Sequence, residues 1–166
     1  RTLGQKLGDR INIYPVKGYS ITIHLKDSIS QLRAPQTGLL DDEAKIVTSR
    51  LGVDRFRVAG TAEFVGFNDE VHPKRVNYLN SKLNEVYPNI FSKVKDDEEA
   101  ELWFGFRPMS ADGLPFIGES KIKGLYLNTG HGHLGWTLAM GSADLIADQI
   151  VNAETQIDSK PYLANR

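Results

Sequence analysis

The sequence L-Y-L-N-T-G-H-G-H-L-G-W-T-L-A-M-G-S-A, residues 125–143, joins a short apolar strand, a glycine-rich loop and the start of a long helix. Such a loop attracts anions, because bare backbone N–H groups and the helix dipole favour negative charge. It differs from the dinucleotide fingerprint G-x-G-x-x-G, since its third glycine comes one residue early and no acidic residue sits on a strand about 20 residues on. The loop therefore predicts either a cofactor contact or a tight turn that lets the helix pack against a sheet.

The N-terminal part of the chain predicts an antiparallel sheet. Its apolar residues alternate with polar neighbours, as in strands with one buried face. The predicted strands lie at residues 11–13, 21–25, 46–48, 56–59 and 61–65. Pro15–Gly18 predicts a bend between the first two strands, and the polar stretch 26–42 predicts no regular element.

Two helices are expected, so the fold class is α+β. The first covers about residues 73–87 and ends at Pro88. The second covers about 134–151, with Leu138, Leu145, Ile146 and Ile150 on its apolar side and small residues, Gly135, Ala139, Gly141, Ser142 and Ala143, for close packing. The remaining segments are a strand at 124–128, a turn-rich loop at 108–115, a solvated acidic connector at 96–99 and a polar, partly ordered tail at 153–166.

Composition limits the classes of function. The 166 residues suffice for about one domain, and 20 basic against 21 acidic residues give no field that favours nucleic acid. The absence of cysteine excludes disulfides, thiolate metal sites and a thiol nucleophile. No apolar run long enough for a membrane span is visible. The start at Arg1 instead of methionine favours a truncated or proteolysed chain.

Two further stretches make the pattern more specific. They are W-F-G-F-R-P-M-S-A-D-G-L-P-F-I-G, residues 103–118, and I-Y-P-V-K-G-Y-S, residues 13–20. Together with residues 125–143 they resemble the C-terminal half of the FAD-dependent D-amino-acid oxidase superfamily. Within it, the likeness is greatest to the bacterial D-amino-acid dehydrogenases (small subunit), and it runs over about residues 7–152.

The resemblance implies a domain organisation. Residues 7–98 would form the substrate-binding (cap) domain, residues 99–152 the C-terminal strand–helix portion of a FAD-binding domain, and 153–166 a tail. The N-terminal βαβ unit with G-x-G-x-x-G, which binds the ADP half of FAD in these enzymes, is absent from this sequence. The resemblance therefore predicts half of an enzyme, with its own N-terminal half as a partner.

The resemblance also implies that the glycine-rich loop lies against the pyrimidine end of the flavin. Its cofactor-binding residues are Gly130, His131, Gly132, His133, Leu134, Gly135, Trp136 and Thr137. The positive end of the following helix would stabilise the negative charge of the reduced ring. FAD is expected to be non-covalent, because the chain has no cysteine for a thioether. No metal site is expected, since the two histidines lack a third ligand nearby.

Arg107 is the strongest candidate for substrate binding. Its guanidinium can hold an α-carboxylate in two parallel hydrogen bonds, and the matching arginine in similar oxidases has this role. The alternative is a structural ion pair with Asp112 or Glu119. The resemblance places Lys17 near the flavin, with a surface lysine as its alternative. The other substrate-binding candidates, with sheet packing as the alternative for most, are Tyr14, Tyr19, Glu63, Phe64 and His131.

The implied reaction is oxidative deamination of a small D-amino acid, with no obligatory protein base. The alternatives are an oxidase of glycine or sarcosine and, for the chain in isolation, a non-catalytic binding module. The resemblance implies a quinone-linked electron acceptor for the intact enzyme, while the sequence itself does not choose between a quinone and oxygen. It also implies a cytoplasmic location, either free or peripheral on the inner face of the cytoplasmic membrane.

Overall fold

The chain forms two compact units in the computed structural model, which describes residues 2–88, 100–164 and 166. Unit 1 contains Arg1–Val16 and Arg107–Arg166, and unit 2 contains Lys17–Phe106. The acidic run 96–99 lies outside the described residues. The bounds of the units differ from those of the predicted functional domains, 7–98, 99–152 and 153–166, and that assignment of function remains a prediction.

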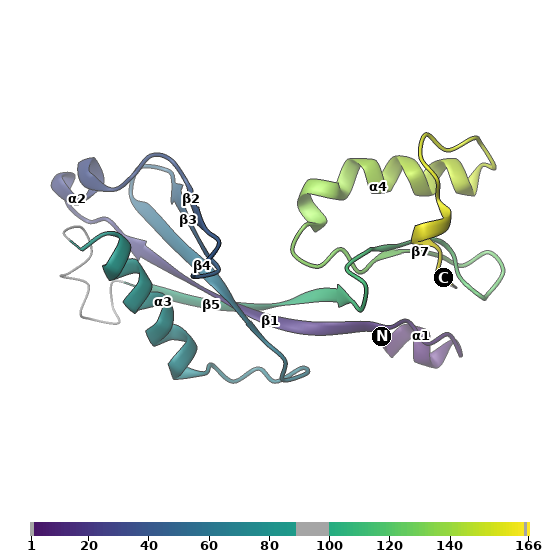
Figure 1. Cartoon of the computed structure of the whole chain (residues 1–166), viewed down its shortest axis with the longest axis horizontal. Coiled ribbons are helices and arrows are strands. Elements are labelled where there is room, and N and C mark those ends of the chain that lie inside the picture. The colour runs from purple at the N-terminus through teal and green to yellow at the C-terminus, as the bar shows by residue number, and fades with distance from the viewer. Residues whose placement is uncertain (1, 89–99, 165) are drawn as a thin grey trace. The chain divides into compact units, whose positions relative to one another are not determined.

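A five-stranded sheet in the order β2-β3-β4-β1-β5 is the main element (Figure 1). The pairings β1–β4, β2–β3 and β3–β4 are antiparallel, so the expected α+β class with an antiparallel sheet is confirmed. The strands are β1 (Ile13–His24), β2 (Leu39–Asp41), β3 (Ile46–Leu51), β4 (Arg55–Glu63) and β5 (Ala100–Ser110).

β1 is a single long strand, so the prediction of two strands separated by a bend at Pro15–Gly18 is wrong. The register against β4 shifts between Lys17 and Tyr19, which absorbs the irregularity as a bulge inside the strand. Side chains on both faces of β1 are buried from Pro15 to Ile23. Burial on both faces hides the simple alternation by which a half-buried strand is recognised in a sequence.

Two other strands extend past the residues that were expected to end them. β4 continues through Gly60 to Glu63, so a separate strand at 61–65 is wrong. Gly60 permits this, because a Cβ there would lie 2.6 Å from the carbonyl oxygen of Lys45. β5 continues through Pro108 to Ser110, so the turn-rich loop expected from residue 108 begins later.

The helices of unit 2 are α2 (Ser28–Arg33) and α3 (Pro73–Val86). α3 matches the expected helix, and it packs against β4. α2 was missed in the polar stretch 26–42; its local signal is the Asp27 side chain, which accepts from Ser30 N. The core of unit 2 consists of Tyr19, Ile21, Ile23, Leu25, Ala34, Ala44, Ile46, Phe56, Val58, Leu79 and Leu83.

Unit 1 contains the hairpin of β6 (Phe116–Glu119) and β7 (Tyr126–Thr129), with α4 (Gly135–Ile150) packed on both strands (Figure 1). The short helices α1 (Thr2–Lys6) and η2 (Lys160–Tyr162) also belong to it. No helix among the described residues is long and apolar enough to cross a membrane.

The apolar side of α4 differs from expectation. Leu145 and Ser142 are buried, but Leu138 and Ile150 are exposed, and so are Ala139, Gly141 and Ala143. The prediction that all the small residues of this helix pack closely is therefore wrong for this chain. The physical reason is that the hairpin has only two strands and covers only part of the helix; Trp136 is 95% exposed.

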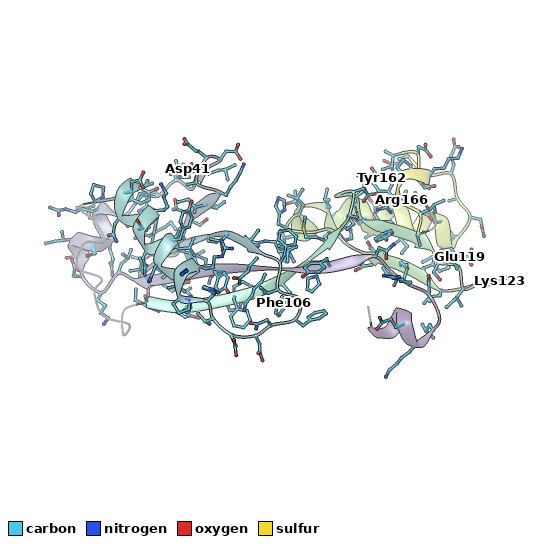
Figure 2. All side chains as sticks on the ribbon, turned by 60° about the horizontal axis from the view of Figure 1, so that its bottom comes forward. Asp41, Phe106, Glu119, Lys123, Tyr162 and Arg166 are labelled. Carbon is cyan, nitrogen blue, oxygen red and sulfur yellow. The ribbon has the colours of Figure 1, made fainter. Side chains whose placement is uncertain are left out.

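The C-terminal segment is attached to unit 1 by Arg166 (Figure 2). Its guanidinium donates to both carboxylate oxygens of Asp112, from Nε at 2.8 Å and from Nη2 at 2.9 Å. It also donates to the Leu114 and Pro115 carbonyl oxygens and lies 4.1 Å from the centre of the Phe116 ring. The tail is therefore held on the segment that follows β5.

Candidate functional site

The glycine-rich loop of unit 1 is joined to the end of β5. Met109 forms an antiparallel bridge with His131, and Gly132 N donates to the Pro108 carbonyl oxygen over 2.9 Å. Gly132 has φ +57°, and a Cβ on it would lie 2.6 Å from Met109 Sδ. The loop therefore needs a residue without a side chain at this point.

Arg107 immediately precedes this bridged segment, so the structure brings the predicted carboxylate-binding residue and the predicted cofactor loop to the same part of unit 1. The Arg107 side chain is half-buried, and burial lowers its pKa below the ordinary value of an arginine. The carboxylates named as structural alternatives have other contacts: Asp112 accepts from Arg166, and Glu119 accepts from Gly124 N.

His131 connects the loop to α4. Its Nε2 lies 2.9 Å from the Oγ of Ser142, which is buried in the helix. Burial lowers the pKa of the imidazole below 6.5, so the ring is neutral at pH 7. His133 and Trp136 are exposed, whereas His131 is attached to α4 by its contact with Ser142.

The start of α4 presents backbone donors. Its N-cap residue, Leu134, makes no side-chain capping bond, and the first turn contains no acidic residue. The first N–H groups of a helix have no partner within the helix, and they carry the positive end of its dipole. Such a terminus favours an acceptor or an anion. No three His, Asp or Glu side chains in the described part of the chain gather as a metal site requires.

The remaining predicted residues fall into two groups. Lys17, Tyr19 and Glu63 are buried together in unit 2, while Phe64 is 72% exposed in the same unit. Tyr14 belongs to unit 1 and is partly exposed. Because the Lys17 side chain is 0% exposed, the alternative of a surface lysine is wrong.

Tyr19 and Glu63 form the centre of the buried group. The Tyr19 hydroxyl donates to Glu63 Oε2 over 2.7 Å and accepts from His72 N over 3.3 Å. Arg75 Nε lies 3.7 Å from Glu63 Oε1. The hydrogen bond from Tyr19 lowers the pKa of Glu63, against the effect of burial, and burial raises the pKa of Tyr19.

No local sequence pattern identifies the residues that surround Lys17. Its ammonium donates to Asn68 Oδ1 over 3.3 Å and to the Glu70 carbonyl oxygen. It also lies 4.4 Å from the Phe104 ring centre and 5.4 Å from that of Tyr19. Asn68 is 51 residues away in the chain, and nothing in a single sequence links the two.

Comparison with known proteins identifies the family. Residues 1–149 match the family described as FAD dependent oxidoreductase, DAO. The chain belongs to the DAO family. It is 44% identical over 160 residues to D-amino acid dehydrogenase 3 of Mesorhizobium japonicum. The aligned residues cover 96% of this chain and 37% of that protein. It is 44% identical over 149 residues to D-amino acid dehydrogenase of Vibrio vulnificus, covering 90% and 34%.

A solved structure of a glycine oxidase, from Geobacillus kaustophilus, is also similar. It superposes with a TM-score of 0.80 and 27% identity, covering 99% of this chain and 42% of that one. The chain thus spans little more than a third of the length of the curated DAO-family relatives that it matches.

The residues of unit 1 fit part of the FAD that the DAO family implies. The α4 terminus has no side-chain cap and no acidic residue in its first turn. Gly130 and Gly132 have positive φ, and a Cβ there would meet Phe116 and Met109 respectively, so glycine at both positions lets the loop lie close to the neighbouring strands. Within the predicted loop, Gly132 and Leu134 already donate their N–H groups to Pro108 and His131. The N–H groups in the first turn of α4, which have no partner within the helix, would hold an electron-rich edge of the ring.

Gly132→Ala should destabilise unit 1 by about 2–3 kcal/mol, through backbone strain and through contact with Met109. Gly124→Ala is the matched control, because Gly124 also has positive φ but a Cβ there meets nothing within 4 Å. Chemical denaturation should show a loss of only about 1–2 kcal/mol for the control. Equal losses in the two variants would contradict a close packing of Gly132 on Met109.

Glu63 should stabilise unit 2 in a pH-dependent way. Because its pKa is lowered in the folded chain, its contribution is present above about pH 4.5 and is lost as pH falls through the lower folded value. Glu63→Gln should cost about 1.5–3 kcal/mol at neutral pH and much less near about pH 3. Denaturation at several pH values measures this difference. The exposed Glu43→Gln should change little at any pH, and a constant difference for Glu63→Gln would refute the assignment.

Proposed function

We propose that this chain is the C-terminal portion of a FAD-dependent D-amino-acid dehydrogenase. In the proposed reaction a small D-amino acid loses two electrons and two protons as its Cα–H bond and one N–H bond break, and the product is an imino acid. Water then converts the imino acid to a 2-oxo acid and ammonia. FAD supplies the acceptor of the hydride when it is bound. The ADP half of this FAD would be held, without a covalent link, by the N-terminal portion.

One structural observation supports the proposal most. The Arg107 segment and the loop that would hold the flavin are joined by the Met109–His131 bridge and by the hydrogen bond from Gly132 N to Pro108. The names of the relatives at 44% identity support the choice of D-amino acids. Arg107 would therefore bind a substrate carboxylate close to the loop.

Arg107 would act by neutralising and orienting the carboxylate. Its half-buried side chain has already lost part of its hydration. A carboxylate that leaves water pays a desolvation free energy of several kcal/mol, which a fixed charged partner can offset. A guanidinium offers two parallel N–H donors, which a lysine ammonium does not. The N–H groups at the start of α4 would stabilise negative charge that develops on the ring.

The relatives are named dehydrogenases, which favours a quinone-linked acceptor over oxygen. Quinones dissolve in lipid, so such an enzyme would work on the inner face of the cytoplasmic membrane. The similar glycine oxidase structure supports a second candidate, an oxidase of glycine or sarcosine.

A direct assay separates the two candidates. The full-length protein that contains this sequence should reduce a dye with D-alanine and show little oxygen consumption. Turnover of glycine or sarcosine with oxygen, and none of D-amino acids, would instead establish the second candidate. The chain by itself should be colourless, and adding the N-terminal portion should restore both the yellow colour and the activity.

Arg107→Ala should weaken substrate binding by about 2–5 kcal/mol in the full-length protein, which raises the half-saturating D-alanine concentration at least about 30-fold. Arg107→Lys should recover only part of this loss, because the fork is gone. Flavin content should stay normal, and the exposed Arg33→Ala serves as control. Steady-state kinetics and the rate of flavin reduction measure the effect. An unchanged half-saturating concentration would show that Arg107 is structural.

A further inference from the structure

Residues 110–115 connect two of the neighbours that hold the glycine-rich loop of unit 1. Before this segment, Met109 forms its antiparallel bridge with His131. After it, Phe116 pairs with Thr129, the residue that precedes the first glycine of the loop. The distance between these two neighbours therefore depends on the path of residues 110–115.

The Phe116 ring also lies against the loop itself. Phe116 is buried, and a Cβ on Gly130 would be 3.2 Å from Cδ2 of the ring. Because protein interiors are close-packed, a shift of this ring would displace the loop at Gly130. The loop ends at Leu134, the N-cap of α4, so its position also sets that of the first turn of the helix.

Arg166 binds the connecting segment through its whole guanidinium (Figure 2). Nε and Nη2 donate to the two carboxylate oxygens of Asp112, over 2.8 and 2.9 Å. Nη2 also donates to the Leu114 carbonyl oxygen over 2.7 Å, and Nη1 donates to those of Pro115 and Leu163, each over 3.2 Å. A guanidinium has five N–H donors, so all of them are used.

The same guanidinium contacts the Phe116 ring. It lies 4.1 Å from the ring centre, and the Arg166 side chain is only 15% exposed. Charge-assisted hydrogen bonds and a cation–π contact are both stronger where little water competes with them. The bonds from Arg166 lower the pKa of the Asp112 carboxyl, so the pair is charged at neutral pH. One side chain therefore fixes both the connecting segment and the ring that supports the loop.

We propose that Arg166 is a positioning residue for the cofactor, which holds residues 112–116 so that the glycine-rich loop and the first turn of α4 are in place before FAD binds. This inference rests on the proposed function for the role of that turn. The contacts run from Arg166 to Phe116 and from Phe116 to Gly130, so Arg166 acts without touching the flavin or the substrate. The apparent dissociation constant for a ligand rises as the fraction of protein in the binding arrangement falls, and Arg166 keeps that fraction high.

The first arm of the test measures the loop in the FAD-free full-length protein. Amide hydrogen exchange of residues 129–134 should be about tenfold faster in Arg166→Gln than in the parent protein. Exchange of residues 142–149 should stay within about twofold, because these amides are bonded within α4. Arg166→Lys keeps the charge but loses the fork, so it should restore slow exchange only in part.

Two further variants complete this arm. Asp112→Asn removes the charge of the partner at an exposed position, and it should speed loop exchange in the same way if Arg166→Gln fails to fold. Lys160→Gln is the matched control, because it removes an exposed cation from the same C-terminal segment. Loop exchange in this control should equal that of the parent protein.

The second arm measures the cofactor and the substrate separately. Titration of the FAD-free protein, followed by flavin fluorescence, should show a dissociation constant about three- to tenfold higher in Arg166→Gln and in Asp112→Asn. At saturating FAD the half-saturating concentration of D-alanine should change less than about twofold, because Arg107 lies in β5, before the connecting segment. A general loss of structure would not separate these two constants.

Each outcome decides a different point. Unchanged loop exchange in both Arg166→Gln and Asp112→Asn would overturn the proposal. An equal acceleration over the loop, β6, β7 and α4 would also overturn it, because Arg166 would then only stabilise unit 1. Faster loop exchange with an unchanged dissociation constant for FAD would overturn the link to the cofactor. If the parent protein binds no FAD or oxidises no D-amino acid, the proposed function fails, while the exchange arm still decides whether Arg166 orders the loop.

Discussion

A charged group buried in β1 constrains much of unit 2. The Lys17 ammonium is enclosed by two aromatic rings and two oxygen acceptors, and both acceptors belong to the segment 64–72 between β4 and α3, so the burial of Lys17 depends on the position of that segment. Tyr19, two residues on, fixes Glu63 at the end of β4 and His72 at the start of α3. The bulge between Lys17 and Tyr19 is where the register against β4 shifts. A local irregularity of one strand thus sets the path of a distant loop.

The main feature of unit 1 is the set of backbone donors at the start of α4. The glycine-rich loop is held by the bridge between Met109 and His131 and by the contact of His131 with Ser142. The start of α4 has no side-chain cap. Fixing donors before a ligand arrives lowers the cost of reorganisation, which is how electrostatic stabilisation becomes effective. The glycine at position 132 is required by its positive φ and by its close approach to Met109.

The sequence predicted elements with a clear period better than those without one. The alternation at β3 and the helical spacing of α3 were sufficient to predict both elements, because each element has one buried side. β1 was divided wrongly, since burial of both its faces removes the alternation, and α2 was missed in a polar segment. The glycine loop was recognised from local residues, but the contact of Lys17 with Asn68 joins positions 51 apart and depends on the register of β1 and β4.

The order of the units along the chain has a consequence for synthesis on the ribosome. Unit 2 is one continuous segment, Lys17–Phe106, whereas unit 1 combines Arg1–Val16, which precede it, with Arg107–Arg166, which follow it. The leading segment contributes the first residues of β1, and its partners after Arg107 emerge only when the whole of unit 2 has been made. Because β1 and β5 are neighbours in the sheet, folding of unit 2 would bring the two segments of unit 1 together before they associate, and this would remove much of the entropy cost of that long-range step.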